Sequence, residues 1–244
     1  LAGHGAKQQV ISDHPLATSV KLPAATGSIA EWKGKQALTG LGIKVPEGGL
    51  AQSCHEAHQI AARIGFPVVM KAQADALAHK SEAGGVLVGI ADDAALSEAW
   101  DKLQANIRTY DASLQLDGIL IEQMAPRGGT EMIVGAKRDP QWGAMIVFGL
   151  GGIWTEALHD AVTLPAHASA DEIRHAMGTL KGIALLNGLR GEKPRDIDAL
   201  VDLILCIGAL IRFNPSIVEI DVNPVNVYAE GQGCIALDAL IVLE

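Results

Sequence analysis

The sequence predicts a mixed α/β (α+β) protein with two lobes, and three observations support this. Short apolar runs alternate with stretches that repeat apolar residues at helical spacing, which is typical of strands followed by helices. Aromatic residues make up only 4% of the chain, so Ala, Val, Ile and Leu must build the core, and 27 glycines favour tight strand–helix turns. A chain of 244 residues is long enough for one large domain or two small packed lobes.

Bulk properties exclude several classes of function. The net charge of -9 argues against a nucleic-acid or membrane-surface role, because both usually need a basic face. The longest apolar run, Leu203 to Ile211, is too short to span a bilayer. The three scattered cysteines contain no CxxC pair, which indicates the reducing cytoplasm rather than a disulfide framework or a zinc site. The chain begins with Leu1 rather than Met, so we expect a piece of a longer polypeptide.

The first lobe is expected over about residues 45–122, after a linker or lead-in over 1–27. A capping box of Ser53 and Glu56 predicts a helix that ends at Gly65. Its other expected elements are strands at 67–71, 86–90 and 118–122 and a helix from about Asp93.

The second lobe is expected over about residues 123–244 together with 28–44, so that the folded domain covers 28–244. A second capping box joins Ser169 and Glu172. The other expected elements are a helix at 31–41 closed by Gly42, a long helix at 196–212, and strands at 131–136, 144–148, 217–222 and 235–240. A strand near Glu122 to Met124 is the expected hinge between the lobes.

Lys71 ends the apolar strand that begins at Pro67. At that place a lysine either emerges into a cleft, where it can bind phosphate as a point charge, or extends along the strand end into solvent. The glycines of Phe148 to Ile153 also follow a strand, and Gly151 and Gly152 let backbone amides approach a phosphate. The alternative is a plain tight turn, because this loop is neither GxGxxG nor a Walker A sequence.

Oxygen ligands gather on one face of the strand around residue 221. Alternate residues of a strand share a face, so Glu219, Asp221 and Asn223 are expected to project together. A hairpin at residues 231–233 brings Asp238 level with Asn223. Such ligands suit Mg²⁺ that bridges nucleotide phosphates, while the alternative is a solvent-facing polar strand face.

His79 lies in a polar loop beside Lys80 and Ser81. It is a candidate functional residue, and the alternative is an ordinary surface histidine. His55 and His58 lie on a helix without the i, i+4 spacing of a helical metal site. The sequence has no visible Ser-His-Asp or Cys-His nucleophile arrangement.

In this order, the segments resemble the ATP-grasp domain, or β subunit, of ADP-forming acetyl-CoA and acyl-CoA synthetases, and more distantly the β subunit of succinyl-CoA synthetase. The resemblance covers about residues 28–244. It is carried by residues 41–46, 64–71, 79–86, 149–153 with Glu156 and Asp160, 188–191, 219–224 and 238–239. It implies an ATP-grasp fold in which Mg²⁺ and ATP or ADP bind between the two lobes.

The resemblance also implies a role for each site residue. Lys71 would contact ATP phosphates, and Gly151 and Gly152 would lie near them. Asn223 and Asp238 match the Mg²⁺ ligands, with Asp221 close by. The hinge strand would border the adenine largely through backbone groups, and its residues are Glu122, Gln123 and Met124. His79 matches a histidine that becomes phosphorylated and relays the phosphoryl group, while a separate CoA-ligase module supplies the acyl site.

One position departs from the family pattern. The family usually has an arginine within a few residues of the aspartate at Asp160, but residues 161–165 contain none. Lys80 and Arg190 are the candidate replacements. The missing arginine favours a second hypothesis, a nucleotide-sensing regulatory domain of a protein acetyltransferase, whereas His79 favours the synthetase. A third possibility is an ATP-grasp ligase that forms an acyl phosphate directly and does not need His79.

Overall fold

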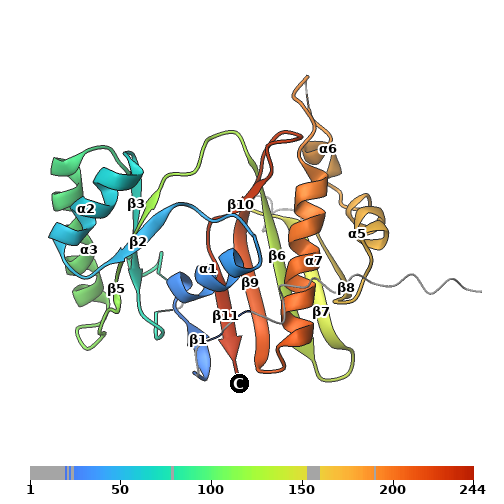
Figure 1. The fold of residues 1–244 in the computed structure, drawn as a ribbon, viewed down its shortest axis with the longest axis horizontal. Coiled ribbons are helices and arrows are strands. Elements are labelled where there is room, and N and C mark those ends of the chain that lie inside the picture. The colour runs from blue at the N-terminus through green and yellow to red at the C-terminus, as the bar shows by residue number, and fades with distance from the viewer. Residues whose placement is uncertain (1–19, 21, 23–24, 78–79, 153–159, 190) are drawn as a thin grey trace, which may run out of the picture.

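A computed structural model describes residues 20, 22, 25–77, 80–152, 160–189 and 191–244 (Figure 1). The expected lead-in over 1–27 therefore lies mostly outside the described residues. Within the described residues, the chain forms two antiparallel sheets with helices packed against them, which confirms the mixed α/β class. No helix in these ranges combines the length and the apolar character that a membrane crossing requires.

The smaller sheet belongs to the first lobe. Its strand order is β2 (Gly48–Ala51), β5 (Gly118–Gln123), β3 (Val68–Gln73) and β4 (Val86–Ile90). The helices α2 (Cys54–Ile64) and α3 (Asp93–Tyr110) pack together on one face of it (Figure 1). Buried side chains of the two helices and of the sheet form one apolar cluster, which includes Leu96, Leu103 and Ile121.

The larger sheet has seven strands and its own core. Its order is β1 (Gly27–Ile29), β11 (Leu240–Leu243), β9 (Ile217–Val227), β6 (Thr130–Asp139), β7 (Gly143–Leu150) and β8 (Ala161–Pro165), with β10 (Cys234–Ala236) also paired to β9. The long helix α7 (Ile197–Phe213) covers β6, β7 and β9, and α5 (Ala170–Met177) packs beside it. The short helix α6 (Ile183–Leu186) lies between these two in sequence.

The helix α1 (Glu31–Gly40) lies between the two sheets (Figure 1). It contacts β11 of the larger sheet. At its start, the Ala30 N–H donates to Asp75 Oδ1 over 2.7 Å and the Trp32 N–H donates to Gln73 Oε1 over 2.9 Å, so it is also fixed to the first lobe. The helix is thus tied to both lobes.

Local sequence signals account for the helix ends. Ser53 caps α2 by accepting the Glu56 N–H, and Gly65 ends that helix with a φ of 81°, which favours glycine. The Ser169–Glu172 capping box is complete, with both reciprocal hydrogen bonds present. In α2 the Glu56 carboxylate instead accepts the N–H of Gln52, one residue earlier than a capping box requires.

The strand expected over 235–240 is wrong as a single element. The chain forms β10 and β11 separately, and residues 237–239 leave the ladder between them. At this break the Leu237 N–H donates to the Pro224 carbonyl, and Asp238 Oδ1 accepts a hydrogen bond from Lys80 Nζ. Three further strands were not predicted from the sequence because they are short and only partly buried, namely β1, β2 and β8.

Replacing Ser169 with alanine is expected to lower the free energy of unfolding by about 1 kcal/mol, because the N-cap side chain of α5 accepts an otherwise unpaired backbone N–H. Urea denaturation measures the change. Ser169→Asp keeps an acceptor at the cap and should stay close to the unsubstituted protein. An equal loss of stability in both variants would contradict the capping role.

Candidate functional site between the lobes

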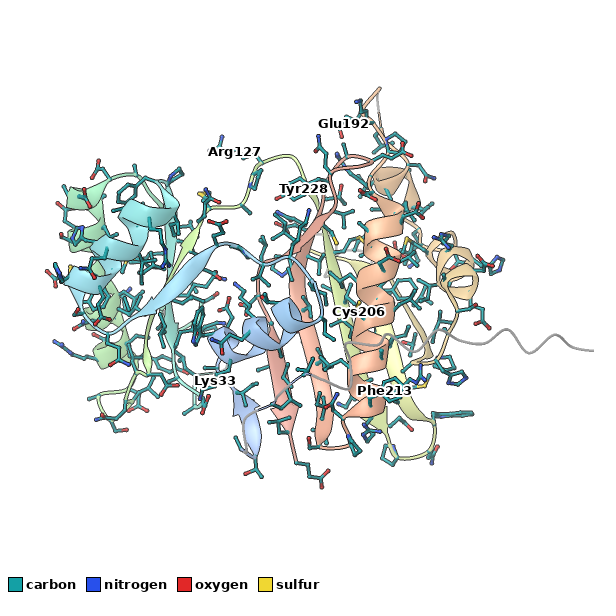
Figure 2. All side chains as sticks on the ribbon, in the orientation of Figure 1. Lys33, Arg127, Glu192, Cys206, Phe213 and Tyr228 are labelled. Atoms are coloured by element: carbon teal, nitrogen blue, oxygen red, sulfur yellow. The ribbon has the colours of Figure 1, made fainter. Side chains whose placement is uncertain are left out.

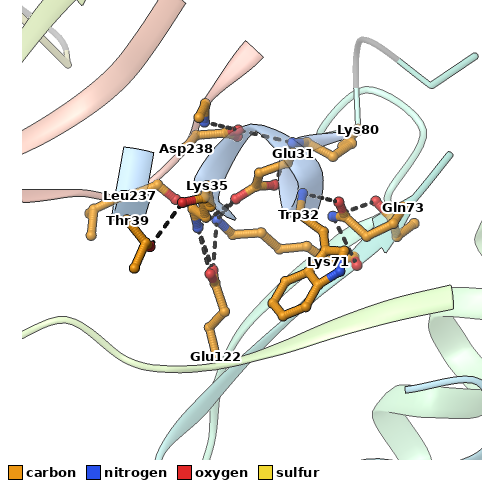
Figure 3. Close-up of polar contacts among 12 residues, drawn as sticks. Glu31, Trp32, Lys35, Thr39, Lys71, Gln73, Lys80, Glu122, Leu237 and Asp238 are labelled. Atoms are coloured by element: carbon orange, nitrogen blue, oxygen red, sulfur yellow. Dashed lines mark hydrogen bonds and ion pairs between the residues drawn. The ribbon is translucent and has the colours of Figure 1, made fainter. Parts of the chain in front are cut away.

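Lys71 projects from β3 into a buried ion network (Figure 3). Its Nζ lies 2.6 Å from Glu31 Oε1, 2.6 Å from the Leu237 carbonyl oxygen and 3.2 Å from Glu122 Oε2. Lys71 is only 9% exposed, so the alternative of a lysine that extends into solvent is wrong. The ammonium instead joins the two lobes, because Leu237 follows β10 of the larger sheet.

Two members of this network were not predicted as site residues from the sequence, namely Glu31 and Lys35. They lie one turn apart on α1, where Lys35 Nζ is 2.7 Å from Glu31 Oε1. Lys35 Nζ also donates to both Glu122 carboxylate oxygens over 2.6 and 2.7 Å. The i, i+4 spacing of Glu31 and Lys35 signals a helical ion pair. Nothing in that spacing signals that both side chains are almost fully buried.

The network holds Glu31 and Lys71 charged in spite of burial, whereas burial and the Lys71 ammonium group lower the pKa of Lys35. Burial alone raises the pKa of the Glu31 carboxyl, but the nearby ammonium groups of Lys71, Lys35 and Lys80 outweigh it and hold the pKa far below its usual value. Burial likewise lowers the pKa of Lys71, but the carboxylates of Glu31 and Glu122 outweigh it and raise the pKa above its usual value. Both groups therefore stay ionised at neutral pH.

The expected hinge residues line the cleft, but two of their backbone N–H groups and the Glu122 carboxylate already have partners in the protein. The Gln123 N–H donates to the Glu47 carbonyl over 2.8 Å, and the Met124 N–H donates to the Pro67 carbonyl over 3.1 Å. The Glu122 side chain turns into the ion network. The three residues line a cavity of about 580 Å³ together with Lys71, and Val88 and Leu237 supply apolar surface from the two lobes.

Asn223 and Asp238 lie level with each other, as the hairpin predicts. The pairs Val225–Ala236 and Asp221–Leu240 are in register on either side of them. Both side chains line the 580 Å³ cavity and also a smaller cavity of about 250 Å³, where Asp221 joins them. Glu219 lines neither cavity and pairs with Lys137 over 3.5 Å.

These oxygen groups fit a divalent cation bound with a nucleotide. Burial, and then the negative charges of Asp238 and Glu219, raise the pKa of the Asp221 carboxyl, so carboxylates crowd one place that a cation would neutralise. Among the described residues, no three His, Cys, Asp or Glu side chains form a metal site by themselves. A cation here would also need the Asn223 amide and ligand oxygens, which suits Mg²⁺ with phosphates.

Gly151 and Gly152 follow β7 and pack against Glu131. The Gly151 N–H donates to the Glu131 carbonyl over 2.8 Å, and a Cβ at Gly152 would lie 2.4 Å from Glu131 Oε2. Glu131 itself lines the 580 Å³ cavity. The glycines thus let the loop approach the cavity wall closely, and residues 153–159, including Glu156, lie outside the described residues.

His79 also lies outside the described residues, but Leu77 before it and Lys80 after it are described. Leu77 and Lys80 both line the 250 Å³ cavity that Asp221, Asn223 and Asp238 line. The segment that carries His79 therefore begins and ends beside the candidate metal ligands.

The missing arginine after Asp160 does not leave that carboxylate unpaired. Asp160 accepts the backbone N–H groups of Lys181 and Gly182, each over 2.8 Å, so it holds the turn before α6. Of the two candidate replacement cations, Arg190 lies outside the described residues. Lys80 lies at the site, where its Nζ is 3.0 Å from Asp238 Oδ1.

Comparison with known proteins shows the family of this chain. The family model of the ATP-grasp domain matches residues 22–243. The β subunit of the ADP-forming acetate–CoA ligase I of Pyrococcus furiosus is 39% identical over 223 residues, which cover 91% of this chain and 95% of the subunit. A trans-feruloyl-CoA synthase from an unknown prokaryotic organism is 44% identical over 91% of this chain, and the chain spans 31% of that synthase.

Solved structures agree. The acetyl-coenzyme A synthetase 1 of Ca. Korarchaeum cryptofilum, solved with coenzyme A and Ca-AMPCP, superposes with a TM-score of 0.85 at 34% identity, over 89% of this chain and 94% of that one. Another structure of that synthetase holds Mg-AMPPCP, with a phosphohistidine segment pointing towards the nucleotide binding site; its TM-score is 0.76 at 33% identity, over 89% of this chain and 93% of that one. The chain therefore belongs to the ATP-grasp family, in the group formed by the β subunits and matching segments of ADP-forming acyl-CoA synthetases.

Proposed function

We propose that this chain performs the nucleotide half of an ADP-forming acyl-CoA synthetase reaction, in which acid, CoA and ATP give acyl-CoA, ADP and phosphate. The observation that carries the proposal is the shared cavity: the residues that flank His79 line it together with Asn223 and Asp238. Phosphoryl transfer requires a nucleophile, a cation and the phosphates at one place, and positioning supplies most of the catalysis.

The nucleotide is proposed to bind in the 580 Å³ cavity. The base lies against the apolar surface of Val88 and Leu237, and the phosphates extend towards Asn223 and Asp238. Lys71 binds a phosphate oxygen by exchanging one of its present partners, such as the Leu237 carbonyl. Asn223 and Asp238 would hold Mg²⁺, which would supply positive charge that neutralises phosphate oxygens.

His79 is proposed as the phosphoryl acceptor. Its neutral ring nitrogen attacks the γ-phosphorus of ATP, a P–N bond forms, and the bond from that phosphorus to the bridging oxygen breaks, which releases ADP. The phosphoryl group then passes to the acyl acid, and CoA displaces phosphate from the acyl phosphate. In the reverse direction the same histidine carries phosphate to ADP.

The acyl and CoA sites are proposed to lie on a separate CoA-ligase module, either an α subunit or a fused domain. Two relatives of this chain, both from Pyrococcus furiosus, are named as β subunits, so they assemble with other subunits. We also propose a cytoplasmic location, because Cys54, Cys206 and Cys234 are all free thiols.

Replacing both Asn223 and Asp238 with alanine is expected to weaken Mg-ATP binding by about 100-fold, because two oxygen ligands of the cation are lost. Isothermal titration calorimetry, with and without Mg²⁺, measures the change. Glu98→Ala is the control, because Glu98 is exposed on α3 and lines neither cavity, so the affinity of this variant should not change. Unchanged affinity and unchanged Mg²⁺ dependence in a folded double variant would refute the site.

A further inference from the structure

Lys80 places a cation on the candidate metal ligand itself. Its Nζ lies 3.0 Å from Asp238 Oδ1 and 2.5 Å from Glu31 Oε2, and its side chain is 13% exposed (Figure 3). Asp238 Oδ1 also accepts the Ala239 N–H over 2.8 Å. This oxygen therefore already has two hydrogen-bond donors, which is the number that its two lone pairs can accept.

The ion network is balanced as it stands. Three ammonium groups face three carboxylates, and the members are Lys35, Lys71, Lys80, Glu31, Glu122 and Asp238. A divalent cation at Asp238 would therefore add two positive charges next to an ammonium group. Like charges at such short range in a partly buried place repel strongly.

Lys80 is the member that can leave. Lys35 and Lys71 are held by Glu31 and Glu122 together, and Lys71 also by the Leu237 carbonyl. Lys80 has one contact to Glu31 and one to Asp238, so release from Asp238 still leaves it one partner. It also lines the 250 Å³ cavity, which gives its ammonium room beside Asp221.

We propose that Lys80 is an internal counter-ion of the metal site, which neutralises Asp238 while no metal is bound and gives Asp238 up when a divalent cation binds there. The inference rests on the metal site proposed above. Lys80 is then a positioning residue. Whether Asp238 binds the cation or the Lys80 ammonium group decides where Lys80, the residue next to His79, is held. The metal site and the segment of the nucleophile are then coupled through one carboxylate.

The test uses Mn²⁺ together with a saturating non-hydrolysable ATP analogue as the probe, because the site needs ligand oxygens from phosphates. Binding of Mn²⁺ to the 244-residue chain is measured by electron paramagnetic resonance. Lys80→Met removes the competing charge and keeps most of the side-chain length. It is expected to bind Mn²⁺ about tenfold more tightly than the unsubstituted chain, the factor that corresponds to about 1.4 kcal/mol. Lys80→Arg keeps the charge and is expected to bind Mn²⁺ as the unsubstituted chain does.

Arg174→Met is the matched control. The Arg174 side chain also pairs with an aspartate, at 2.8 Å from Asp198 Oδ1, but it lies on α5 and lines neither cavity. Its Mn²⁺ affinity should not change. Equal or weaker Mn²⁺ binding by folded Lys80→Met would overturn the inference while leaving the metal site in place. If the unsubstituted chain binds no Mn²⁺, the metal site and the inference both fail.

A second measurement needs no variant. Acetylation of the unsubstituted chain by acetic anhydride, mapped by mass spectrometry, reports how accessible each lysine is. With the ATP analogue present, saturation with Mn²⁺ is expected to raise the modification rate of Lys80 several-fold, because its ammonium group gives up the Asp238 carboxylate. Lys35 and Lys71 should stay protected, and Lys102, which is exposed on α3, should not change. An unchanged rate at Lys80 would overturn the inference even if Lys80→Met does not fold.

Discussion

Replacing Glu31 with glutamine is expected to lower the free energy of unfolding by about 3–5 kcal/mol, because the removal of one partner from a buried ion network leaves uncompensated charge. Glu31 is the only carboxylate among the described residues that contacts Lys35, Lys71 and Lys80 together. Its side chain is fully buried. Glutamine keeps the volume and removes the charge, so the change isolates the electrostatic contribution.

The pH dependence of stability tests the same interaction. The pKa of Glu31 is held far below its usual value of 4.5, so the folded protein keeps this carboxylate ionised when the unfolded chain takes up a proton. The contribution to stability is fully present well above pH 4.5 and is lost progressively as the pH falls below it. The Glu31→Gln variant should lose less stability than the unsubstituted protein between pH 7 and pH 4, a range that spans that value.

Urea denaturation at the two pH values measures both effects. Glu192→Gln is the control, because Glu192 is 63% exposed (Figure 2) and its partner Arg195 keeps a hydrogen bond to Thr130 Oγ1 when the charge of Glu192 is removed. Loss of an exposed carboxylate from an ion pair costs about 1 kcal/mol. A Glu31→Gln variant as stable as this control at pH 7 would show that the network does not hold the lobes together.

The level placement of Asn223 and Asp238 could be predicted from the sequence because it depends on local rules. The period of two along a strand decides which residues share a face, and the short hairpin fixes the register. The same period also predicts Glu219 on that face, and its charge reaches Asp221, but Glu219 lines neither cavity and pairs with Lys137. The strand pattern predicts a shared face, but neighbouring strands decide which part of that face lines the cleft.

The ion network could not be predicted, because its members come from distant parts of the chain. Glu31 and Lys35 precede the first lobe, Glu122 ends it, and Asp238 lies near the end of the chain. No local pattern brings these residues together. Only the packing of α1 between the lobes does so. The strand pattern also left Lys71 open between the cleft and solvent, and it did not predict the carboxylate partners of Lys71.

Substitution of His79 with alanine is expected to abolish phosphoryl transfer and to reduce acyl-CoA synthesis by at least about 1,000-fold, because the variant lacks the atom that forms the P–N bond. The chain is first combined with its CoA-ligase module, since the acyl site is proposed to lie there. Incubation with Mg²⁺ and γ-labelled ATP should then label the unsubstituted assembly. The label should be acid-labile and stable to base, as a phosphoramidate is.

Mapping of the labelled peptides separates His79 from any histidine of the module. His175→Ala is the control: His175 is exposed on α5, away from the cleft, and its loss should change neither labelling nor turnover. Mg-ATP binding by the His79→Ala chain should persist, because Lys71, Asn223 and Asp238 all remain. That persistence would distinguish loss of the nucleophile from collapse of the site. Efficient acyl-CoA synthesis by the His79→Ala assembly would exclude the relay and favour direct transfer of phosphate to the acyl acid.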